Sequence, residues 1–91
     1  MRATLIGGMT RLRKDYIAAA ARAGVRLTAL SGSEKDVAAR IGATDRLIVF
    51  TNMISHSARN KAVHAARSRH IPVTMAHSCG VSTLSNLLGA A

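Results

Sequence analysis

The sequence predicts an α/β fold in which a four-stranded parallel sheet lies between two layers of helices, a Rossmann- or flavodoxin-like three-layer sandwich with strand order 2-1-3-4. Four short apolar runs alternate with segments of helical periodicity, and short turns join them. The third run, residues 47–50, has four consecutive large apolar residues, which is typical of a strand buried on both faces. Crossovers between parallel strands are right-handed, so the helices cover both faces. Since 91 residues can build only one adequate core, we expect a single domain over residues 1–91.

The first strand and helix form the first unit of this pattern. Residues 2–6 are a short apolar run that stops at Gly7 and Gly8, which predicts a buried strand entering a tight turn. Apolar residues recur at helical spacing over residues 10–23, with the cations on other faces. Gly24 is suited to the carboxyl-terminal cap of this helix.

The second unit is shorter. Residues 25–30 read as a strand, and a turn of serine and glycine follows it. Ser33 and Asp36 resemble a capping arrangement, which predicts a short helix that runs through Ile41.

The third and fourth units complete the pattern. Residues 46–51 form the expected central strand, and Ser57 is the expected cap of a helix that extends to about His70. Pro72 then opens a fourth strand at residues 73–76. The final helix carries an apolar stripe of Val81, Leu84, Leu87 and Leu88.

The charge balance indicates an anionic partner. Thirteen Lys and Arg residues against four Asp and Glu residues give a formal net charge of +9, and all four acids precede residue 46. Such a field raises the local concentration of nucleotides, phosphorylated metabolites or nucleic acid. Aromatic residues make up only 2% of the chain, so few side chains can stack on the bases of a nucleic acid.

Composition also sets expectations for compartment and assembly. The single cysteine, Cys79, excludes an internal disulfide. No charged-then-apolar leader and no long apolar run is present, so we expect a cytoplasmic protein with no membrane partner. Because so thin a core leaves apolar surface uncovered, we expect a homodimer or higher oligomer.

The expected ligand site lies at the carboxyl ends of the parallel strands. In such sheets ligands bind where the strand order reverses, here between the first and third strands. The turns to consider are residues 7–11, 51–57 and 77–83. Cations at the starts of the first and third helices oppose the helix dipole, which a bound anion would neutralise. The predicted anion-binding residues are Gly7, Gly8, Arg11, Thr51, Asn52, Ser55, His56, Ser78, Gly80 and Ser82.

The preferred function is a binding or regulatory module without catalysis, and two other classes stay open. An enzyme would use His56 or Cys79 as its reactive group. A haem or metal protein would draw its ligands from His56, His77 and Cys79. The chain lacks CxxC, HxxxH and HExxH spacings, and we expect His64 and His70 to be exposed. A structural subunit of an oligomer is compatible with any of these functions.

Three motifs in order resemble a known bacterial family. They are Leu5-Ile6-Gly7-Gly8 at the end of the first strand, Thr51-Asn52-x-x-Ser55-His56 after the central strand, and Ser78-x-Gly80-x-Ser82-x-Leu84 after the last. Together they are similar to the family of domain of unknown function 2325 over nearly the whole chain. The resemblance implies a small Rossmann-like domain, alone or attached to others, with no established activity to carry over.

The chain departs from that family at two positions. Asn52 stands where many relatives have an acidic residue, which argues against a metal-binding or ribose-binding carboxylate at that turn. Cys79 stands where Arg is common, so any anion contact there depends on backbone amides and on arginines elsewhere.

Overall fold

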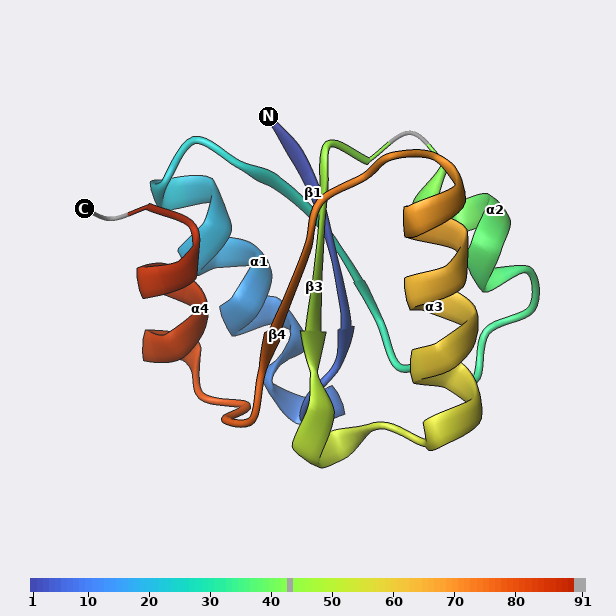
Figure 1. Ribbon diagram of the computed structural model, residues 1–91. Coiled ribbons are helices and arrows are strands. Elements are labelled where there is room, and N and C mark those ends of the chain that lie inside the picture. The colour runs from blue at the N-terminus through green and yellow to red at the C-terminus, as the bar shows by residue number, and fades with distance from the viewer. Residues whose placement is uncertain (43, 90–91) are drawn as a thin grey trace.

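The computed structural model of the chain describes residues 1–42 and 44–89, and its sheet has the predicted topology. Four parallel strands lie in the order β2-β1-β3-β4, which confirms the α/β fold and the strand order. The strands are β1 (Arg2–Gly7), β2 (Arg26–Leu30), β3 (Arg46–Phe50) and β4 (Val73–Ala76). All four carboxyl ends point to the same edge of the sheet (Figure 1).

In the part of the chain that the structure describes, four helices cover the two faces of the sheet. Helices α1 and α4 pack together on one face, while α2 and α3 pack together on the other (Figure 1). No helix in the described part of the chain combines the length and the hydrophobicity needed to cross a membrane. The helices are α1 (Arg13–Arg22), α2 (Val37–Ile41), α3 (His56–Ser68) and α4 (Val81–Leu87), and 3-10 turns at Thr10–Leu12 and Thr51–Met53 precede α1 and α3.

The central strands divide the core into two halves. Leu5 and Phe50 face the α1–α4 side, while Ile6 and Val49 face the α2–α3 side. Every residue of 47–50 is fully buried, which confirms the prediction for the central strand. Because side chains alternate along a strand, both faces of β1 and β3 need a helix layer, and the loops carry the accessible polar groups.

The end of α1 follows the prediction, but its start does not. The predicted continuous helix from residue 10 begins with a 3-10 turn, and α1 itself starts at Arg13. Gly24 has φ +77°, its amide donates to Ala21 O (3.0 Å), and the Val25 amide donates to Ala20 O (2.9 Å). These two bonds form a Schellman motif, so the predicted glycine cap is confirmed.

The predicted cap of α2 is wrong. The residue before α2 is Asp36, which has φ +56° and makes no side-chain capping bond. The Ser33 hydroxyl instead lies 2.8 Å from the Ser31 hydroxyl. The physical reason is that residues 31–34 form their own hydrogen-bonded turn, in which the Glu34 carboxylate accepts from the Ser31 and Gly32 amides and Ser33 is bonded to Ser31.

The predicted cap of α3 is also wrong, by two residues. Ser55 is the cap, and its hydroxyl accepts a hydrogen bond from the Ala58 amide (3.1 Å). Ser55 has extended backbone angles and stands three residues before its donor, as a capping residue must, whereas Ser57 already lies in the first turn. The helix ends at Ser68 with Arg69 as its carboxyl-terminal cap, close to the expected end near His70.

We expect His70→Gly to stabilise the protein by about 0.5–1 kcal/mol, because His70 occupies a left-handed position that suits glycine. Its φ is +58°, and the bonds from the His70 amide to Arg67 O (3.1 Å) and from the Ile71 amide to Ala66 O (2.8 Å) close α3. Urea unfolding measures the change. The same substitution at the exposed His64, inside α3, is the control and is expected to destabilise the protein. Equal losses at both positions would contradict the prediction.

Candidate ligand-binding site

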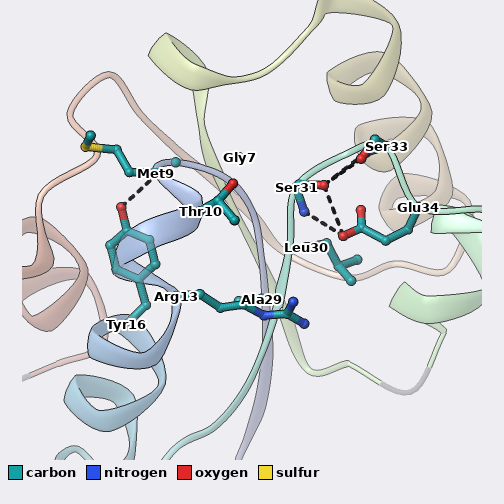
Figure 2. A pocket seen from close by; sticks show the side chains of 11 residues that line it. Gly7, Met9, Thr10, Arg13, Tyr16, Ala29, Leu30, Ser31, Ser33 and Glu34 are labelled. Atoms are coloured by element: carbon teal, nitrogen blue, oxygen red, sulfur yellow. Dashed lines mark hydrogen bonds between the residues drawn. The ribbon is translucent and has the colours of Figure 1, made fainter.

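A cavity of about 340 Å³ opens between the carboxyl ends of β1 and β2. One wall comes from the turn after β1 and the start of α1, and the other comes from the end of β2 and the loop after it (Figure 2). We call it the β1–β2 cavity. Its lining residues are Gly7, Gly8, Met9, Thr10, Arg13, Tyr16, Ala29, Leu30, Ser31, Ser33 and Glu34.

The glycine pair shapes the turn after β1. Gly7 has φ +92° and Gly8 has φ +84°, conformations that L side chains rarely adopt. A Cβ at Gly7 would lie 2.7 Å from the carbonyl oxygen of Phe50 and 3.3 Å from that of Met53. The end of β1 is therefore pressed directly against the end of β3. The backbone occupies the junction of the first and third strands, and the cavity lies on the other side of β1.

The buried side chain of Tyr16 fixes the position of this turn through a hydrogen bond. Its side chain is 1% exposed, its hydroxyl accepts from the Met9 amide (3.2 Å), and the same hydroxyl donates to Cys79 O (2.5 Å). The ring packs edge-on against Phe50 with 5.6 Å between centroids and a 71° interplanar angle. The turn after β1, the loop after β4 and the core are thus joined through one buried side chain.

Glu34 brings a carboxylate to the opposite wall. Its oxygens accept from the Ser31 amide (2.9 Å), the Gly32 amide (2.8 Å) and the Ser31 hydroxyl (3.1 Å). Partial burial acts to raise the pKa of Glu34, but these hydrogen bonds to the charged form lower its pKa below the ordinary value. The group is therefore an anion at neutral pH.

The predicted residues of the first turn divide between the cavity and the surface. Gly7 and Gly8 line the cavity, whereas no residue of the other two turns expected at the site, 51–57 and 77–83, is among its lining residues. Arg11 is exposed in the 3-10 turn and is not among the lining residues, whereas Arg13 is. Figure 2 shows the Arg13 side chain extending from α1 toward β2.

The predicted residues after β3 and β4 form a second polar cluster. The Thr51 hydroxyl lies 3.4 Å from both Ala76 O and Nδ1 of His77. The Asn52 amide nitrogen donates to Sγ of Cys79 over 3.8 Å. The structure thus brings Thr51, Asn52, His77 and Cys79 together at the ends of β3 and β4, separately from the β1–β2 cavity.

The other predicted residues have local roles. Ser55 is occupied as the cap of α3, and Nδ1 of His56 lies 3.2 Å from the Arg59 guanidinium. The Ser78 hydroxyl accepts from the Gly80 amide (3.2 Å) in the loop that leads into α4. Ser82 is exposed on α4. Within residues 1–42 and 44–89, no three His, Cys, Asp or Glu side chains lie together in a way that could hold a metal ion.

Sequence reasoning missed the far wall of the cavity, namely Ser31, Ser33 and Glu34, and it preferred Arg11 over Arg13. A usable signal was present. The run Ser31-Gly32-Ser33-Glu34 is polar, follows a buried strand and belongs to the neighbour of β1 in a 2-1-3-4 sheet. A polar turn on an adjacent strand borders the same edge as the glycine turn.

Comparison with known proteins identifies the family. No curated protein and no solved structure matches the chain. One family model, described as "Uncharacterized protein conserved in bacteria (DUF2325)", matches residues 2–91. This match agrees with the fold and with the resemblance carried by the three motifs. The chain therefore belongs to the DUF2325 family of bacterial proteins.

Proposed function

We propose that this domain is a binding module for a phosphorylated small molecule, such as a nucleotide or a phosphorylated metabolite, and that the phosphate binds in the β1–β2 cavity. The observation that carries the proposal is the composition of one wall, where a glycine turn, Thr10 and Arg13 line a cavity at the carboxyl ends of parallel strands. Ligands of open α/β sheets bind at that edge.

The chemistry of this wall favours a phosphate. The first amides of a helix have no acceptor within the helix, and the helix dipole places partial positive charge at the same end. At Gly7 and Gly8 the space that a side chain would need is taken by Phe50, Ile54 and Tyr16, so the two glycines allow the turn to pack closely while its backbone lines the cavity. A guanidinium such as that of Arg13 can donate two parallel hydrogen bonds to a phosphate.

The shape of the site favours a small molecule over a nucleic acid. A volume of about 340 Å³ lies in the range of small-molecule cavities. The one Tyr and the one Phe of the chain are both buried, with 1% and 0% of their surface exposed. Neither ring is available to stack on bases, which single-stranded nucleic-acid binding commonly uses.

We expect Arg13→Ala to weaken binding of adenosine monophosphate by about 10- to 100-fold, the size of a lost charge-assisted hydrogen bond. Isothermal titration calorimetry at low salt measures the affinity. Arg22→Ala is the matched control, since it removes the same charge from the other end of α1, away from the cavity. The proposal would be refuted if the wild-type protein bound neither adenosine monophosphate nor inorganic phosphate. It would also be refuted if the two variants lost the same amount of affinity.

A further inference from the structure

Glu34 is the unexpected member of the β1–β2 cavity. It is one of only four acids in a chain of net charge +9, and it lines a cavity whose other wall carries Arg13. Figure 2 shows its carboxylate on the side of the β2 loop, across from Thr10 and the glycine turn. An inorganic anion alone gains nothing from this carboxylate and is repelled by it.

The position of the carboxylate is fixed by its own loop. Three hydrogen bonds, from the amides of Ser31 and Gly32 and from the Ser31 hydroxyl, hold both oxygens. A carboxylate offers about four acceptor sites, so the three bonds leave room for about one donor from a ligand. Because its position is set before any ligand arrives, it can accept from a ligand without a further ordering cost.

The ligand that fits both walls therefore carries a phosphate at one end and hydroxyl donors at the other. The hydroxyls of Ser31 and Ser33 lie beside Glu34 in the same wall, 2.8 Å from each other, and add groups that can donate or accept. We infer that the cavity recognises a sugar phosphate, with the phosphate at the Gly8–Arg13 wall and one sugar hydroxyl donating to Glu34. This inference rests on the proposed function and adds the substrate class.

A purely structural role for Glu34 makes a different prediction. If the carboxylate only holds the loop after β2, the sugar is bound by the other groups of that loop, and Ser33→Ala lowers the preference for the sugar phosphate as much as replacement of Glu34 does. If Glu34 itself accepts from a sugar hydroxyl, Ser33→Ala leaves most of that preference in place. The affinity ratio of two ligands, compared between the two variants, therefore separates the roles.

The test compares ribose 5-phosphate with methyl phosphate, which has the same phosphate monoester and no hydroxyl, on the wild-type protein, on Glu34→Gln and on Ser33→Ala. Calorimetry at low salt measures both affinities. We expect the wild-type protein to bind ribose 5-phosphate at least about tenfold more tightly than methyl phosphate. In Glu34→Gln we expect that advantage to fall to less than about threefold, while methyl phosphate binds equally well or better because a repulsive charge is gone.

The possible results distinguish a failure of the sugar subsite from a failure of the proposed phosphate site. Equal affinity of the wild-type protein for the two compounds overturns the sugar subsite and leaves the phosphate site standing. An advantage for ribose 5-phosphate that persists in Glu34→Gln overturns the role of Glu34 in the same way. If the wild-type protein binds neither of these compounds but binds adenosine monophosphate, the sugar-phosphate inference fails and the proposed function stands. If it binds none of the three, the proposed function fails and this inference fails with it.

Discussion

Gly7→Ala is expected to destabilise the protein by about 3 kcal/mol or more, because a strained backbone angle and a collision act together. At φ +92° any L side chain is strained, and the added Cβ would lie 2.7 Å from Phe50 O and 3.2 Å from Cβ of Ile54. The carbonyl belongs to the backbone at the end of a buried strand, so it cannot turn away as a flexible side chain would. Urea unfolding followed by circular dichroism measures the loss.

Gly24→Ala is the matched control for this prediction. Gly24 also has a positive φ, +77°, but a Cβ there would meet nothing within 4 Å. Only the conformational penalty of about 1–2 kcal/mol applies. The difference between the two variants therefore measures how tightly β1 presses on β3. Equal losses would show that the two strand ends are not in close contact.

The fold could be predicted because each strand and most helix ends are marked by residues that lie next to one another in the sequence. Four consecutive apolar residues at 47–50 predict a doubly buried strand, and Gly24 after a helical period predicts a cap. The cap of α3 was not predictable in the same way. Ser55 and Ser57 are both good caps in the sequence, and the choice depends on where the chain leaves the 3-10 turn that packs against Gly7.

The candidate site was predictable only in part, for a geometric reason. Gly7 and Gly8 mark the turn after β1 from the sequence alone. Which side of β1 holds the cavity depends on the contact between Gly7 and Phe50, and those residues are 43 positions apart. Arg13 lines the cavity in place of the expected Arg11 because residues 10–12 form a 3-10 turn. Such a turn has three residues per turn and therefore points its side chains in other directions than an α-helix does.

Tyr16→Ala is expected to cost about 3–5 kcal/mol, the range for removing a large buried ring. The Tyr16 ring is 1% exposed and packs on Phe50, so its loss leaves a void among side chains that belong to β3 and α4 as well as α1. For a domain of this size such a loss is a large share of the total stability. Thermal and urea unfolding that differ little from wild type would contradict the packing seen here.

Tyr16→Phe tests the contribution of the hydroxyl group separately from that of the ring. The Phe variant keeps the edge-on contact with Phe50 but leaves the Met9 amide and the Cys79 carbonyl without their partner, at an expected cost of about 1–3 kcal/mol. Because the Met9 amide belongs to the turn that lines the β1–β2 cavity, we also expect weaker binding of methyl phosphate by Tyr16→Phe than by wild type. Lost stability with unchanged binding would show that the hydroxyl supports the fold alone. Unchanged stability would show that the bridge between the two loops contributes nothing.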